Sequence, residues 1–116
     1  MSTKSFTFDL ADDPASRVAG LKNVSNLPMG HGMLFVFDQP QALRFTMQDV
    51  LIPLDIAFID ANGIIRKVER MAPGVGAIYD SGVPCKMALE VSAGQLAAVD
   101  VGQRAFIDWA SKTIGI

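Results

Sequence analysis

Residues 86–91, with the sequence Lys-Met-Ala-Leu-Glu-Val, alternate between apolar and polar or small side chains. Successive side chains of a β-strand point to opposite faces of a sheet. The alternation therefore places Met87, Leu89 and Val91 together on one face. This pattern is typical of a strand with one buried face, and it predicts that Glu90 lies on the opposite, polar face.

Six further segments have the pattern of strands, because they alternate in polarity or form short apolar runs between turn residues. They are residues 6–10, 32–37, 43–47, 54–60, 64–71 and 103–109. Asp-Ala-Asn-Gly at 60–63 predicts a hairpin turn, since Asn and Gly tolerate a positive φ. Residues 38–41 also predict a turn, and the charges of 64–71 predict an exposed edge strand. The sequence thus predicts a mainly β single domain over residues 1–116, either a compact β-sandwich or a partly open barrel.

Two short helices complete the predicted fold. Asp13 followed by Pro14 has the residue types of an N-cap and a first helical position, which predicts a helix over residues 14–21. Residues 92–95 have the spacing of a capping box, which predicts a second helix over 94–99. One shared core is expected to contain Phe35, Phe37, Phe45, Phe58, Leu89 and Ile107.

The composition restricts the class of protein. The chain has 116 residues, of which 50% are hydrophobic, so it can bury a real core and is not mainly disordered. Its net charge of -2 argues against a nucleic-acid-binding platform, which presents a basic face. The longest apolar stretch, Val50–Ile59, is too short for a membrane-spanning helix. No secretory signal is visible, so we expect a soluble cytoplasmic protein without membrane insertion.

Several short motifs occur in a fixed order along the chain. They are Gly20-Leu21, Gly32–Phe37, Phe45-x-Met47, Leu51–Asp60 with Gly63, Leu89-Glu90-x-x-Ala93-Gly94, and Gly102. In this order and spacing the chain resembles the domain of unknown function 192 family, from about Phe6 to Ile107. The resemblance implies a compact β fold of the sandwich type and no established activity. Many members of that family carry an export signal.

One motif departs from the family's pattern. Where the family usually reads Phe-Trp-Met-Lys-Asn-Thr, this chain reads Phe-Thr-Met-Gln-Asp-Val at residues 45–50. The tryptophan, lysine and asparagine are therefore replaced by Thr46, Gln48 and Asp49. A family ligand that depended on those three groups would lose them here.

Asp55 is the only charged residue within the apolar run 50–59. A buried carboxylate must be hydrogen-bonded or ion-paired, because removing its water is costly. One interpretation is a ligand-binding or catalytic carboxylate. The interpretation we favour is a structural anchor, which accepts backbone N–H groups near Pro53 or pairs with Arg44.

The other chemically notable side chains have simple structural interpretations. Glu90 is expected to be solvated or salt-bridged, although together with Asp55 it could form a hydrolase's carboxylate pair. His31 is expected to be a solvated loop residue, and no second ligand lies near it at zinc spacing. Cys85, the only cysteine, is expected to be a free packing thiol, so no disulfide is expected. No complete catalytic constellation can be assembled, so an enzyme ranks last, and no metal or cofactor is expected.

Any binding site is expected where residues 45–47 meet the strand over 54–60. Ligand sites combine a mostly apolar lining with a few fixed polar groups, and this region has that mixture. Asp55 would be the polar anchor, and the walls would come from Arg44, Phe45, Met47 and Glu90. Two functions remain open. The first is a non-catalytic binding module for a small ligand or peptide, and the second is a structural module of a larger complex or homo-oligomer.

Overall fold

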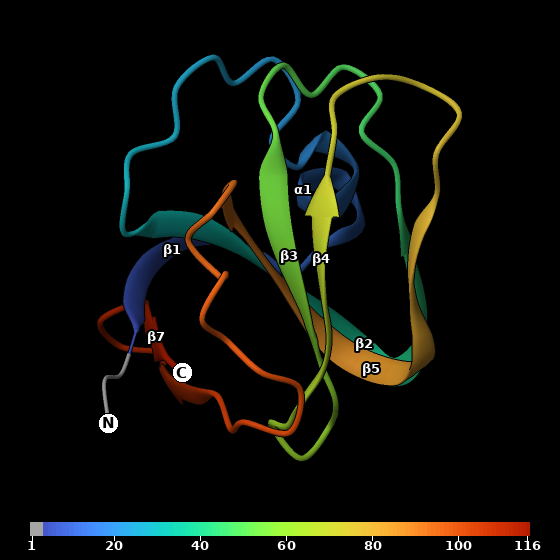
Figure 1. The fold of residues 1–116 in the computed structure, drawn as a ribbon. Helices are drawn as coiled ribbons and strands as arrows, with labels where there is room; N and C mark the ends of the chain where they lie inside the picture. The colour runs from blue at the N-terminus through green and yellow to red at the C-terminus, as the bar shows by residue number, and fades with distance from the viewer. Residues whose placement is uncertain (1–3) are drawn as a thin grey trace.

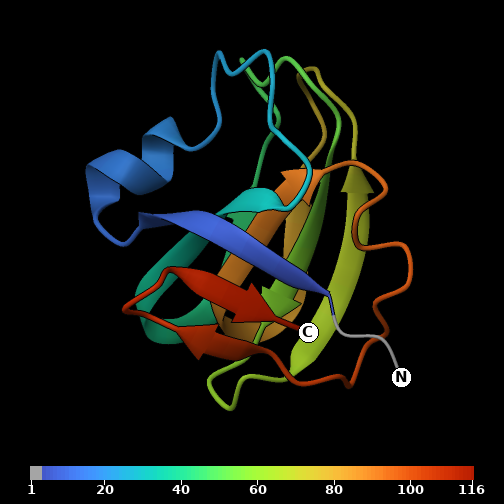
Figure 2. The same ribbon diagram turned by 90° about the vertical axis from the view of Figure 1, so that its left-hand side faces the viewer.

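A computed structural model describes residues 4–116 as one sheet curled into a half-barrel, with one short helix beside it (Figures 1 and 2). The elements are β1 (Ser5–Ala11), α1 (Pro14–Ala19), β2 (His31–Phe45), β3 (Leu54–Ile59), β4 (Ile65–Met71), β5 (Tyr79–Ser92), β6 (Phe106–Asp108) and β7 (Thr113–Gly115). The strand order is β4-β3-β5-β2-β1-β7-β6, with β1 and β2 parallel and all other neighbours antiparallel. The predicted mainly β domain is confirmed, in its partly open barrel form.

The long strands β2 and β5 are paired along most of their lengths and form the spine of the sheet. Figure 1 shows this pair crossing behind β3 and β4, and Figure 2 shows β1, β7 and β6 on the other side of the curl. Residues 38–41, predicted as a turn between two strands, instead lie within β2, so that prediction is wrong. The register with β5 shifts between Val36 and Gln41. The irregularity bends the strand without ending it, because pairing with β5 resumes beyond it.

The buried side chains form two clusters on opposite faces of the sheet. The first cluster includes Phe6, Phe8, Leu34, Ile59, Leu89 and Val91, with Ile107 packed against it. The second includes Phe35, Leu43, Met47, Leu54, Ile56 and Phe58, with Phe37 and Phe45 packed against it. The predicted single core is therefore wrong. Adjacent residues such as Leu34 and Phe35 point to opposite faces, and both faces are covered.

The predicted helix near residue 14 is confirmed. Asp13 caps α1, since its Oδ1 accepts the Ser16 backbone N–H at 2.7 Å, and the helix ends at Gly20, whose φ is 46°. The predicted helix over 94–99 is wrong, because residues 93–98 form turns. Gly94 has a φ of 96°, which interrupts helical geometry, and the N–H groups of Gly94 and Leu96 bind the Asp55 side chain.

The sequence predicts only some of the features at the edges of the sheet. The hairpin turn at 60–63 and the edge position of β4 are confirmed, and Gly63 has a φ of 82°. The predicted strand over 103–109 is shorter than expected, because only β6 is a strand there. The strand β7 was not predicted. Within residues 4–116, no helix has both the length and the apolar character needed to span a bilayer.

Candidate functional site

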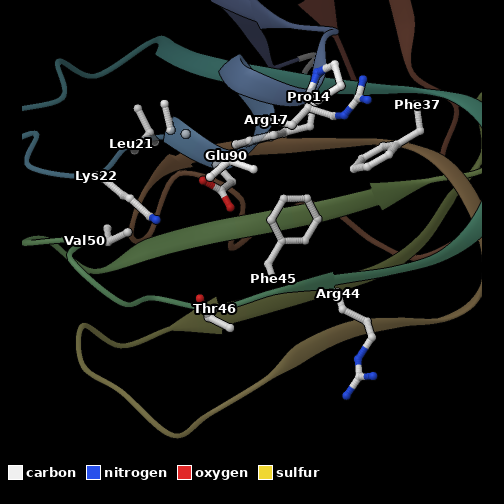
Figure 3. A pocket seen from close by; sticks show the side chains of 14 residues that line it. Pro14, Arg17, Leu21, Lys22, Phe37, Arg44, Phe45, Thr46, Val50 and Glu90 are labelled. Carbon is white, nitrogen blue, oxygen red and sulfur yellow. The ribbon is translucent and has the colours of Figure 1, made fainter.

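A pocket of about 470 Å³ lies between the second core face of the sheet and the α1 segment with the turn that follows it (Figure 3). This volume falls within the range typical of small-molecule sites. Residues 14–22 contribute one wall, and the rest comes from β2, from Thr46 and Val50 in the segment after β2, and from Glu90 of β5. The pocket is therefore built from segments that are far apart in the sequence.

The segment after α1 is held over the sheet by local contacts. The ring of Phe35 lies close to Gly20, since a Cβ built at this glycine would be 3.4 Å from the ring. The positive φ of Gly20 turns the chain here, and the backbone N–H of Asn23 donates to the Asp49 carbonyl at 2.8 Å. These contacts bring Leu21 and Lys22 to the pocket.

Glu90 is the acidic residue of the pocket lining. It lies on β5 between Met33 of β2 and Ile56 of β3, and only 4% of its surface is exposed. Within residues 4–116 its carboxyl group has no hydrogen-bond or ion-pair partner, and Figure 3 shows it directed into the pocket. Burial raises the pKa of Glu90 to about 8. At neutral pH the group therefore holds its proton, and its O–H is available to donate a hydrogen bond.

Three phenylalanine rings form the aromatic part of the pocket lining. Phe35 and Phe45 meet edge to face with their centroids 5.0 Å apart, and Phe37 and Phe45 do so at 6.5 Å. Phe45 also packs against the buried Phe58 at 5.9 Å. Such contacts fix the ring positions, so the apolar wall is preorganised.

Three cationic side chains also line the pocket. Arg17 is fixed, because its Nη1 donates to the Val36 carbonyl at 2.9 Å and its guanidinium lies 4.9 Å from the centre of the Phe37 ring. Figure 3 shows the Lys22 ammonium directed toward the pocket and the Arg44 guanidinium directed away from Glu90. Among residues 4–116, Lys22 has no ion-pair partner. The lining thus combines three cations with one carboxyl group.

The structure brings together three of the five predicted site residues. Arg44, Phe45 and Glu90 line the pocket. Met47 is 1% exposed and belongs to the second core cluster, without lining the pocket. Asp55 pairs in register with Val91, next to Glu90 along β5, so it lies on the opposite face of the sheet.

Asp55 is surrounded by structural partners. Its Oδ2 accepts the backbone N–H groups of Gly94 at 2.8 Å and Leu96 at 3.1 Å. Its Oδ1 accepts the Arg70 Nε–H at 2.6 Å. Its partners are thus Arg70 and the turns after β5, and neither Arg44 nor the backbone beside Pro53 is among them. These bonds anchor the turns at 93–98 to β3.

The expectation that Glu90 is solvated or salt-bridged is wrong. Alternation along β5 correctly separates it from Leu89 and Val91, but its own face is covered by the segment after α1. Sequence reasoning also missed Arg17 and Lys22 as pocket residues. The Gly20-Leu21 motif lies between these two residues, but it does not indicate which part of the sheet the segment covers.

The remaining candidates lie elsewhere. His31 begins β2 and is not in a flexible loop; its Nδ1 lies 2.8 Å from Thr7 Oγ1 and its Nε2 lies 3.3 Å from Asp9 Oδ2. Cys85 is a buried free thiol in the second cluster, and burial raises its pKa, which makes it unreactive. Across residues 4–116, no three His, Cys, Asp or Glu side chains are grouped so that they could hold a metal ion.

The fold and the pocket define the class: a small mainly β protein whose curled sheet carries a buried carboxyl group in an aromatic-lined pocket. The family model DUF192, described as "Uncharacterized ACR", matches residues 1–109. The chain therefore belongs to the domain of unknown function 192 family, as its motifs predicted.

Two solved structures share this fold. One is described as a "putative transcription regulator" from Sinorhizobium meliloti 1021; it is 32% identical, with 88% of each chain covered and a TM-score of 0.81. The other is a protein of unknown function from Novosphingobium aromaticivorans DSM 12444. It is 25% identical, with a TM-score of 0.82, and the match covers 85% of this chain and 73% of that one. No curated protein matches the chain.

Proposed function

We propose that the chain is a non-catalytic binding module whose small-molecule ligand lies in the pocket over Glu90. The observation that carries the proposal is Glu90, a residue only 4% exposed, whose carboxyl group has no partner within residues 4–116 and faces a pocket of about 470 Å³. A buried polar group without a partner is costly, and a ligand that bonds to it offsets that cost. The preorganised phenylalanine wall supplies the apolar contact such a site needs.

Direct contact with nucleic acid is not supported for this chain. The Sinorhizobium protein is described as a "putative transcription regulator". A domain that contacts DNA presents a basic face, whereas this chain has 10 Lys and Arg against 12 Asp and Glu. The three cations of the pocket surround a small cavity and form no extended stripe. We therefore propose a small ligand as the partner.

Fragment binding observed by two-dimensional amide NMR tests the proposal. Small aromatic fragments are expected to shift amide resonances of residues 17–22, 44–46 and 90 in the wild-type protein. In the Thr46→Trp variant an indole stands at the pocket lining, and we expect the shifts to be lost. The matched control is Gln48→Trp, which adds the same indole to the same exposed segment outside the pocket.

The two variants must give different results if the pocket is the site. Loss of binding in Thr46→Trp with binding retained in Gln48→Trp supports the proposal. Equal binding in all three proteins, or fragment shifts that cluster away from these residues, contradicts it. The amide spectra also report whether each variant is folded, so loss of binding is distinguished from unfolding.

A structural module remains the second candidate, and one observation favours it. β6 lies at the sheet edge and carries Phe106, which is 66% exposed, with Trp109, 51% exposed, just beyond it. Large exposed aromatic side chains are typical of protein contact surfaces. Light scattering across a concentration series tests this candidate. A dimer that Phe106→Lys converts to a monomer supports it, and a wild-type monomer at all concentrations contradicts self-assembly.

A further inference from the structure

We infer that the ligand of this pocket is a small organic acid with an apolar body, bound with its carboxylate near Lys22 and its body against the phenylalanine wall. The inference rests on the proposed function, because it names the class of molecule for the same pocket. It is carried by the arrangement of charges, rings and the unpartnered Glu90.

The charges that line the pocket favour an anion. Arg17 from α1, Lys22 from the following turn and Arg44 from β2 are the cations, and Glu90 from β5 is the only acid among the lining residues. The flanking strands place only Met33 and Ile56 beside Glu90, so no further titratable group faces it from them. An anionic ligand gains attraction from these cations that a cationic ligand does not.

Lys22 and Arg17 have different roles in this arrangement. Arg17 is held by the Val36 carbonyl and the Phe37 ring, so its guanidinium is a fixed charge with further N–H groups free to donate. Lys22 is exposed and points toward the pocket, so it can follow the ligand. Charge-assisted hydrogen bonds of this kind are stronger than neutral ones.

Glu90 complements the acid as a donor. Its burial keeps it protonated at neutral pH, so it offers an O–H group to a ligand oxygen. An ionised Glu90 would instead repel a bound carboxylate. The neutral, donating form is therefore the one that fits an organic acid.

Three probes with the same phenyl body separate the ligand classes: phenylacetate, phenylacetamide and phenethylamine. Dissociation constants are measured at pH 7 from amide NMR titrations of the full chain. We expect phenylacetate to bind at least about tenfold more tightly than the amide or the amine. Between pH 7 and pH 9 its affinity should fall roughly tenfold as Glu90 ionises.

Variants test each contact. Glu90→Gln keeps a donor and is expected to bind phenylacetate within about threefold of wild type, whereas Glu90→Leu weakens binding about tenfold. Lys22→Gln is expected to weaken it roughly fivefold. The matched control is Lys112→Gln, an exposed lysine before β7 that does not line the pocket.

The outcomes separate this inference from the proposed function. Tighter binding of phenethylamine, equal binding of acid and amide, or loss of phenylacetate binding in Glu90→Gln overturns the organic-acid class. In each of these cases the pocket still binds a ligand, so the proposed function stands. If none of the three probes shifts the resonances of residues 17–22, 44–46 and 90, both are overturned.

Discussion

Replacing Glu90 by glutamine is expected to remove a pH-dependent loss of stability. The carboxyl has an ordinary pKa of 4.5 in an unfolded chain, and burial raises its pKa to about 8 in the folded protein. Each pKa unit corresponds to roughly 1.4 kcal/mol, so ionisation of Glu90 costs the fold about 5 kcal/mol above pH 8. Glutamine has a similar shape and does not titrate.

The sign of the effect follows from proton binding. Between pH 4.5 and pH 8 the folded protein holds the Glu90 proton that the unfolded chain has released. The contribution of neutral Glu90 to the free energy of unfolding is therefore fully present below pH 4.5 and is lost as the pH rises through this window. At pH 7 the loss is about 3 kcal/mol, a large part of the net stability of a domain of this size.

Urea denaturation from pH 5 to pH 8, followed by far-ultraviolet circular dichroism, measures the effect. The free energy of unfolding of the wild type is expected to fall by roughly 3–4 kcal/mol relative to Glu90→Gln across this range. Other titrating groups contribute to both proteins and cancel in the difference. Glu69→Gln, at the only other glutamate, is the matched control and should follow the wild type.

A flat difference between wild type and Glu90→Gln across this pH range would refute the reasoning. It would mean that the Glu90 carboxyl is hydrated or paired in solution. A difference that grows toward low pH would also refute it, because it would show that the fold stabilises the ionised form.

Five further substitutions have expected effects on the free energy of unfolding, measured by the same denaturation at pH 7. Asp55→Asn should lower the free energy of unfolding by about 2–4 kcal/mol, because it disturbs all three hydrogen bonds of the Asp55 carboxylate. Arg70→Gln should lower it by about 1 kcal/mol or less, because the exposed arginine is only one of the three partners. Equal losses in the two variants would contradict the anchoring role. Gly32→Ala should lose about 1–3 kcal/mol, because its Cβ would lie 2.5 Å from a carbonyl oxygen of β5; an unchanged midpoint would contradict the close approach. Phe58→Ala should lose about 3–5 kcal/mol, and Phe37→Ala clearly less, because Phe58 is 0% exposed and Phe37 is half-buried.

The fold class could be predicted because strand periodicity is local. Alternation at 86–91 and in the other segments is a property of neighbouring residues, and so are the Asp13 cap and the hairpin at 60–63. The division of the core into two clusters could not be predicted. It depends on which segments cover each face, and the alternation of β5 is the same whether its Glu90 face meets water or protein.

Predicting the pocket also requires knowing which distant segments cover each face of the sheet. Arg44, Phe45 and Glu90 line one pocket, whereas Asp55, which is predicted to lie beside them, lies on the opposite face of the sheet. A one-residue offset in the β3–β5 register decides its face, since Asp55 pairs with Val91 and Ile56 pairs with Glu90. The pattern within each strand does not contain that register.

The two buried acids of this chain show how partners separate a structural role from a binding role. Asp55 and Glu90 are both 4% exposed. Asp55 receives three hydrogen bonds, from Arg70 and from the backbone of Gly94 and Leu96, so its carboxylate has partners within the fold that it stabilises. Glu90 receives none within residues 4–116 and is expected to lower stability at neutral pH, so packing gives no reason for a carboxyl group at this position. Buried polar groups without partners are found mainly where function requires them. The Glu90 carboxyl faces a pocket and is available to a ligand, whereas the Asp55 carboxylate already bonds to the fold.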